Sequence, residues 1–333
     1  MTQTISQKLL ITGGSGFIGT NLIDLASKKG ILLLNVDIQP PLCKEQSHFW
    51  RRTDILDADS LKIAFLDFRP DWVVHLAART DCDDATTVED GYQVNTVGTE
   101  NVLLAIRSTP SVSRAIITST QFVCRPGVIP KNGDEYDPHT VYGQSKVLAE
   151  HLTRRANLGC TWTIIRPTNI WGPWHMRYRA QFLRALSKGA YLHPSGRSCT
   201  KSYGYVGNVV HQILRICEAS PEVVHGKTLY VGDRPIDLLA WVNAFSQELR
   251  RKPVCTAPYW ALRGLATVGD VMSLCMGRPF LINSRRFRSM TEDYIVPMED
   301  TFRLLGESPF SLQEGVRATV KWLRDLDGGV STA

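Results

Sequence analysis

The stretch TGGSGFIG, residues 12–19, follows directly on the apolar run KLLI and leads into a helical pattern. It places Gly13, Gly16 and Gly19 at three-residue spacing. In a strand, loop and helix of this kind the first glycine permits a tight turn. The second lets backbone approach a pyrophosphate, and the third lets the helix pack on the sheet. Because a helix N-terminus also favours an anion, the stretch predicts a dinucleotide-binding unit at the start of the chain.

Short apolar runs recur as far as Pro167, and helical patterns separate them. The runs are KLLIT, ILLLNVD, WVVHLA, RAIITS and TWTIIRP. None of them alternates apolar with polar residues, which indicates strands that are buried on both faces. The pattern therefore predicts an α/β fold with a doubly wound parallel sheet.

The rhythm changes after Pro167, where the aromatic and basic stretch WGPWHMRYR begins. We expect a dinucleotide-binding domain over residues 1–170 and mainly a smaller α/β substrate-binding lobe over residues 171–333. Two later apolar patterns, near 203–206 and 228–232, predict strands that return to the first domain.

The composition is that of an ordinary globular protein, with 43% hydrophobic residues in 333 and a net charge of +6. The basic residues are scattered, so we expect no nucleic-acid partner. Eight cysteines without CxxC pairs indicate reduced thiols, and no metal site is expected. The first strand begins too early to leave room for a signal peptide. The apolar run at 259–277 is interrupted by Arg263 and Asp270, so it is too polar to span a bilayer and predicts an amphipathic helix or a wall of the substrate lobe. With the reduced cysteines, we expect a cytoplasmic location and no membrane partner.

Asp37 closes the second apolar run, eighteen residues after Gly19. A carboxylate there would accept hydrogen bonds from the adenosine ribose and repel a 2′-phosphate, so it favours NAD over NADP. A strand-end turn residue is the alternative. Asp54 and Ile55 follow a further short strand, where they could flank the adenine.

Tyr142 and Lys146 stand four positions apart in TVYGQSK, residues 140–146. On a helix this spacing places both side chains on one face. A tyrosine pKa is about 10 without neighbours, and a nearby cation favours the phenolate. The pair alone is equally compatible with an exposed tyrosine beside a solvated lysine.

Together these motifs resemble the extended short-chain dehydrogenase/reductases, and more narrowly the NAD-dependent epimerase/dehydratase family that acts on nucleotide sugars. The matching motifs extend over nearly the whole chain and occur in the same order as in the family. It rests on TGGSGFIG, Asp37, HLAA at 75–78, VNTVGTENVL at 94–103, IITST at 116–120, YGQSK, RPTNIWGP at 166–173 and SLQEGVRATVKWL at 311–323. It implies a doubly wound Rossmann sheet, a small-molecule substrate and NAD as the cofactor.

The resemblance also implies roles for single residues. Tyr142 is the acid/base, Lys146 binds the nicotinamide ribose and lowers the tyrosine pKa, and the Thr120 hydroxyl holds the reacting oxygen. Asn95 braces the helix. The cofactor-binding set is Gly13, Gly16, Phe17, Ile18, Gly19, Asp37, Asp54, Ile55, Leu76, Ala77, Ala78, Asn95, Tyr142, Lys146 and Pro167, and the substrate-binding set is Thr120, Gln121, Asn169 and Lys201.

Departures from the family pattern narrow the chemistry. Gln121 and Phe122 stand where the 4,6-dehydratases have an acidic pair, which argues against dehydration. The first of them also replaces the glutamate of related decarboxylases, and the second replaces the cysteine of the GDP-fucose synthase type. A redox step at one carbon, or a 4-epimerisation, remains. Lys201 replaces an arginine of the family pattern. Its ammonium group could bind a diphosphate as a single positive charge, but it cannot form the two parallel hydrogen bonds of an arginine guanidinium.

The sequence therefore predicts an NAD-dependent nucleotide-sugar epimerase or dehydrogenase. A dehydrogenase of a non-nucleotide alcohol is the alternative, because GYVGNVV and PFLINSRRFRSM look like the hydroxysteroid and dihydroflavonol branches. An NAD-binding regulatory protein is a third reading, although such proteins typically lose the tyrosine or lysine. The resemblance further implies a homodimer formed through helices near 87–107 and 140–157.

Overall fold

A computed structural model describes residues 6–277 and 282–328, which belong to two compact units. The first unit comprises Met1–Trp174, Gly204–Asp233 and Val296–Phe310, and the second comprises His175–Tyr203, Arg234–Ile295 and Ser311–Ala333. The segment 296–310, which the sequence assigned to the second lobe, therefore belongs with the first unit. The reason is packing, since a helix within it contacts an edge strand and a covering helix of the main sheet.

A seven-stranded sheet forms the centre of the first unit, in the order β11-β6-β5-β4-β1-β2-β3. All neighbouring strands run parallel. This confirms the predicted doubly wound parallel sheet. The strands are β1 (Lys8–Thr12), β2 (Leu32–Asp37), β3 (Trp50–Arg52), β4 (Trp72–His75), β5 (Arg114–Thr118), β6 (Thr161–Pro167) and β11 (Thr228–Val231).

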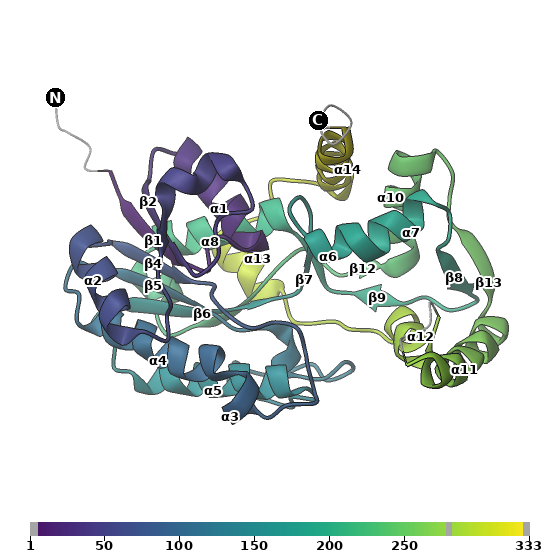
Figure 1. Ribbon diagram of the computed structural model, residues 1–333, viewed down its shortest axis with the longest axis horizontal. Helices are drawn as coiled ribbons and strands as arrows, with labels where there is room; N and C mark the ends of the chain where they lie inside the picture. Colours follow the sequence, from purple (N-terminus) through teal and green to yellow (C-terminus); the bar gives the residue numbers. More distant parts are fainter. Residues whose placement is uncertain (1–5, 278–281, 329–333) are drawn as a thin grey trace. The chain divides into compact units, whose positions relative to one another are not determined.

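Helices cover both faces of this sheet (Figure 1). One face carries α1 (Phe17–Lys28), α8 (Val206–Glu218) and α13 (Glu299–Leu305). The other carries α2 (Ala58–Phe68), α4 (Gln93–Arg107) and α5 (Val141–Arg155). Shorter helical segments are η1 (Lys44–Phe49), α3 (Val88–Gly91), η2 (Gln121–Val123) and α9 (Pro221–Val224).

The sequence predicted that two later strands, near 203–206 and 228–232, return to the first domain, and these strands pair with different sheets. The strand expected near 228–232 is β11, an edge strand of the main sheet. The strand near 203–206 is β10 (Tyr203–Tyr205), which pairs instead with β7 (Asn169–Trp171) in a separate two-stranded sheet.

Burial on both faces explains why the strands lack polar alternation. Leu10, Val73, Ile117 and Ile164 on the strands and Phe65 on α2 are at most 1% exposed. Burial of each such side chain stabilises the fold by about 1.5–3 kcal/mol. Polar caps then set where the helices begin: Asp57 accepts a hydrogen bond from Ser60 N, and Thr140 accepts one from Gly143 N.

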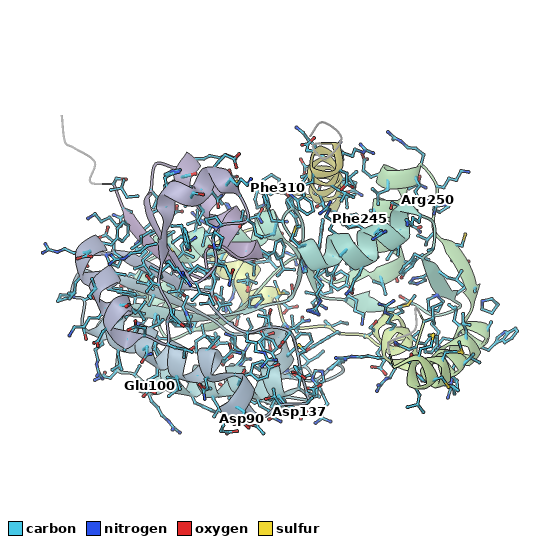
Figure 2. The ribbon with its side chains drawn as sticks, viewed as in Figure 1. Asp90, Glu100, Asp137, Phe245, Arg250 and Phe310 are labelled. Carbon is cyan, nitrogen blue, oxygen red and sulfur yellow. The ribbon has the colours of Figure 1, made fainter. Side chains whose placement is uncertain are left out.

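The second unit is built from short strands and helices. Its strands pair as β8 (Leu192–Ser195) with β13 (Cys255–Pro258), and β9 (Thr200–Lys201) with β12 (Ile236–Asp237). Its helices are α6 (Met176–Tyr178), the π-helical turn η3 (Arg179–Leu183), α7 (Arg184–Ser187), α10 (Leu238–Arg250), α11 (Tyr259–Met276), α12 (Ser284–Thr291) and α14 (Leu312–Gly328). Trp241 and Phe245 of α10 pack against Phe182. Phe245 is labelled in Figure 2.

Helix α11 is the element that the sequence predicted at 259–277. Across the residues that the structure describes, no helix combines the length and apolar character that crossing a membrane requires.

Candidate active site

The carboxyl ends of parallel strands meet at one edge of a sheet, where ligands of such folds bind. Most of the predicted site residues follow these ends directly. Gly13 follows β1, Leu76 with Ala77 and Ala78 follows β4, and Thr120 lies two residues past β5, while Asp37 and Pro167 are the last residues of β2 and β6. The fold thus brings these segments of the first unit to a single edge.

Gly13 cannot be replaced without moving backbone. Its φ is +72°, and a Cβ there would lie 2.5 Å from Ala77 N. Gly19 is equally confined, since its Cβ would lie 2.4 Å from Gly14 Cα. At Gly16 the nearest obstacle is Gly13 O at 3.3 Å. The loop therefore closes tightly at its two ends and leaves its middle glycine accessible, as the approach of a pyrophosphate requires.

Helix α1 begins at Phe17 without a side-chain cap. Gly16 occupies the N-cap position, and the first turn holds no acidic residue. Phe17 and Ile18 are half-buried. The first N–H groups of the helix thus keep the positive end of its dipole available for an anion.

Asp37 ends β2 beside this loop. Its Oδ2 accepts a hydrogen bond from Ser15 N at 3.1 Å, and its Oδ1 accepts one from Gln39 N at 2.9 Å. Burial raises the pKa of the Asp37 carboxyl, and these backbone N–H groups oppose the rise. Asp54 is exposed and accepts from Leu56 N, whereas Ile55 is 4% exposed. Contact of either residue with adenine stays a prediction.

The side chains of Thr120 and Tyr142 lie near each other, and Thr120 favours the charged form of the tyrosine. Thr120 begins η2, where its Oγ1 accepts a hydrogen bond from Phe122 N at 3.3 Å. Tyr142 lies in the first turn of α5 and is 7% exposed. Burial raises the pKa of Tyr142 well above 10, and the nearby Thr120 side chain opposes this rise. In this environment the tyrosine is a protonated donor, so proton removal needs further stabilisation of the phenolate.

Lys146 lies one turn along α5 from Tyr142 and is 2% exposed. Desolvation lowers its pKa to about 8, while the nearby Glu150 carboxylate opposes the shift. Within the described part of the chain its Nζ has no hydrogen-bond or ion-pair partner. A buried ammonium without partners costs free energy unless a ligand satisfies it. Hydroxyl groups of a ribose fit that requirement, and the predicted lowering of the Tyr142 pKa by Lys146 stays a prediction.

Asn95 of α4 is fully buried and ties two parts of the site together. Its Oδ1 accepts from Arg79 N at 2.8 Å, and its Nδ2 donates to Arg79 O at 3.0 Å. The same Nδ2 donates to Ser145 Oγ at 2.9 Å. The loop after β4 is therefore linked to α5 between Tyr142 and Lys146, which is a bracing geometry.

Two features of the site escaped the sequence analysis. Glu150 on α5 and Arg166 on β6 form a buried ion pair, with Arg166 Nε 2.8 Å from Glu150 Oε1. Arg166 lies within the motif RPTNIWGP, but nothing in the sequence names its partner. In addition, the buried hydroxyls of Ser119 and Thr168 have no hydrogen-bond partner among the described residues. These hydroxyls follow β5 and β6, at the edge where the predicted cofactor residues gather.

The predicted substrate residues are divided between the two units. Gln121 is 1% exposed in η2, and Asn169 is half-buried at the start of β7. Lys201 belongs to the second unit, where it is buried and its Nζ donates to Glu292 O. The ammonium group has two further N–H donors that could bind a diphosphate, and this role of Lys201 stays a prediction. The described residues hold no cluster of His, Cys, Asp or Glu that could bind a metal.

Comparison with known proteins agrees with this geometry. The model of the NAD dependent epimerase/dehydratase family matches residues 9–232. A 4-epimerase of N-acetylglucosaminyl-diphospho-undecaprenol from Escherichia coli O157:H7 is 29% identical, with 96% of each chain covered. A 3β-hydroxysteroid dehydrogenase/isomerase from Mycobacterium tuberculosis is also 29% identical, over 71% of this chain and 68% of its own.

Solved structures share the fold. UDP-glucose 4-epimerase from Thermotoga maritima superposes with a TM-score of 0.72 at 22% identity, covering 96% of this chain and 99% of its own. UDP-glucuronic acid 4-epimerase from Bacillus cereus gives 0.71 at 19% identity, covering 96% of this chain and all of its own.

Proposed function

Because this chain belongs to the NAD-dependent epimerase/dehydratase family, we propose that it epimerises a carbinol carbon of a diphosphate-linked sugar. The observation that carries the proposal is the buried Thr120–Tyr142 pair, with Lys146 one turn away and with Gln121 and Phe122 in place of acidic residues. Such a site can move one hydroxyl proton but offers no carboxylate there for water loss. Nucleotide sugars are the first candidate substrates, and the name of the Escherichia coli relative adds sugars carried on a polyprenyl diphosphate.

The residues divide the work as follows. Tyr142 takes the substrate hydroxyl proton as general base and returns it as general acid, and Thr120 holds the oxygen in line. Lys146 stabilises the tyrosinate that forms. Gly13, Gly16, the start of α1, Asp37 and Lys146 would hold NAD, which supplies the hydride acceptor and donor.

The first test is the state of the cofactor. An epimerase must keep its cofactor through the cycle, so protein purified without added NAD is expected to release near-stoichiometric NAD on denaturation. The same preparation should interconvert the 4-isomers of a UDP-sugar or a polyprenyl-diphosphate sugar without added NAD. Protein that is empty and binds NAD reversibly would argue against the epimerase.

A dehydrogenase of a flat, non-nucleotide alcohol is the second candidate. The similarity to the Mycobacterium tuberculosis steroid enzyme supports it, although that similarity covers less of both chains. Such an enzyme would reduce added NAD in step with alcohol oxidation and would release NADH, which an epimerase does not.

Selectivity for NAD supplies a second prediction. Replacing Asp37 by alanine removes the carboxylate that repels a 2′-phosphate, so the preference for NAD over NADP is expected to fall at least tenfold. The change should come mainly from tighter NADP binding, measured by titration with both cofactors. Asp59→Ala is the control, because the Asp59 carboxylate is exposed on α2 and lies outside the predicted cofactor-binding set. Unchanged selectivity in Asp37→Ala would place the discrimination elsewhere.

A cytoplasmic homodimer remains part of the proposal. Helices α4 and α5 pack together, and Val97, Leu104 and Leu148 on them are 43–45% exposed. Apolar side chains on two adjacent helices would suit a four-helix contact between copies. The molar mass in solution tests this directly.

A further inference from the structure

Helix α11 has an inner face that accounts for only part of its apolar content. Leu262 and Ala266 are buried against Phe287 of α12. Tyr259 and Leu192 extend this small core. These contacts recur every three or four residues, so they use a single stripe of the helix.

The opposite side of α11, which we call the outer face, is also apolar. Leu274 is 85% exposed, Trp260 76%, Val271 59% and Val268 57%. Leu265, Met272 and Met276 add further exposed apolar surface. A surface helix normally turns charged residues outward, and a contiguous exposed apolar patch marks an interaction site. The outer face therefore needs a partner.

Basic side chains are exposed on the same two helices. Arg263 lies on α11, and Arg285, Arg286 and Arg288 lie on α12, all four exposed. Asp270 is the one acidic residue in the described parts of 259–291, so these helices carry 4 − 1 = +3. The two helices that include the apolar surface therefore carry a net positive charge, and Glu292 and Asp293 follow directly after α12.

Helix α12 packs against α11 (Figure 1). Asp270 Oδ1 accepts from Ser284 N at 3.0 Å, and its Oδ2 accepts from Ser284 Oγ. Asn283 caps α12 by accepting from Arg286 N at 2.9 Å. Asp270 is therefore occupied in fastening α12 to α11.

We propose that the outer face of α11 and the arginines of α12 dock this protein on a membrane that contains anionic lipids. An apolar face flanked by Arg is the pattern of helices that lie in the plane of the interface, and a Trp at one end suits the headgroup level. Each basic residue near an anionic surface adds affinity. The sequence predicted no membrane partner because no segment can span a bilayer, but lying on one requires only one apolar face. Docking is independent of the proposed reaction, and it would place the enzyme beside lipid-linked forms of the substrate.

A second copy of the chain fits this surface less well. A two-fold contact through the outer face would set the +3 of one copy against the +3 of the other. Juxtaposed like charges oppose association. Anionic lipid headgroups match the same charge.

The test is sedimentation of the full chain with vesicles of phosphatidylcholine alone and with added phosphatidylglycerol. We expect binding to the anionic vesicles that weakens with salt. The double variant Val271→Glu with Leu274→Glu should lower the partition coefficient at least tenfold. Ile63→Glu with Leu66→Glu is the matched control, because these α2 side chains are 50% and 47% exposed at the same spacing, and it should bind as wild type.

The arginines are tested separately by Arg285→Gln with Arg288→Gln, which should weaken binding to anionic vesicles by about tenfold or more. The proposal is overturned if wild type does not sediment with anionic vesicles, or if both glutamate pairs reduce binding equally. Self-association of the wild type through this face is a further outcome that overturns the proposal. In that case the wild type does not bind vesicles, and the double variant Val271→Glu with Leu274→Glu is a monomer. None of these results depends on knowing the substrate or on NAD turnover.

Discussion

Replacing Tyr142 by phenylalanine is expected to lower kcat by about 10²–10⁴-fold, the usual contribution of a positioned general acid or base. The variant keeps the ring, which packs in a small cluster with Val88 and Tyr92. It loses only the hydroxyl, whose pKa the nearby Thr120 side chain lowers. Because the cofactor would still meet the glycine loop, Asp37 and Lys146, NAD affinity should change little.

Tyr92→Phe is the matched control for this experiment. The rings of Tyr92 and Tyr142 are 6.2 Å apart, but the Tyr92 hydroxyl accepts from Asp83 N and donates to Asp81 instead. Its loss should leave turnover within a few fold. Full turnover in Tyr142→Phe would remove Tyr142 from the mechanism, and a parallel loss of NAD binding would indicate a structural role. Single-turnover rates and NAD titrations separate these results.

The glycine loop could be predicted because its constraint is local. Gly13 needs a positive φ, and the strand before it and helix after it are both visible in the pattern. The parallel sheet could be predicted for a similar reason, since a strand buried on both faces is apolar at every position. The spacing of Tyr142 and Lys146 implied a shared helix face, and the structure places both on α5.

Contacts between distant segments could not be predicted in this way. Asn95 reaches Ser145 and Arg79 only because α4 packs on α5, and neither partner is marked in the sequence. The desolvation that lowers the Lys146 pKa likewise depends on everything packed around it. Residues 296–310 belong to the first unit because α13 packs against β11, and no local sequence pattern predicts that contact.

The Glu150–Arg166 pair is the most consequential of these distant contacts. Arg166 is fully buried, and its guanidinium also contacts Tyr230 and the carbonyl of Gly133. The Tyr136 hydroxyl donates to Glu150 Oε2 at 2.9 Å. The network joins α5, one turn beyond Lys146, to β6 just before Pro167. It therefore holds α5 against the sheet while placing a negative charge near Lys146.

Replacing Glu150 by glutamine is expected to lower the free energy of unfolding by about 3–5 kcal/mol, because the Arg166 charge is then buried without a counter-charge. The second readout is NAD binding against pH. Lys146 is protonated below its pKa of about 8, so affinity should fall as pH rises through that value. The Glu150 charge raises this pKa, so the decline in Glu150→Gln should begin at lower pH. Glu100→Gln on the exposed surface of α4 is the control and should alter neither property (Figure 2). A destabilised variant with an unshifted pH profile would show that Glu150 supports the fold without tuning Lys146.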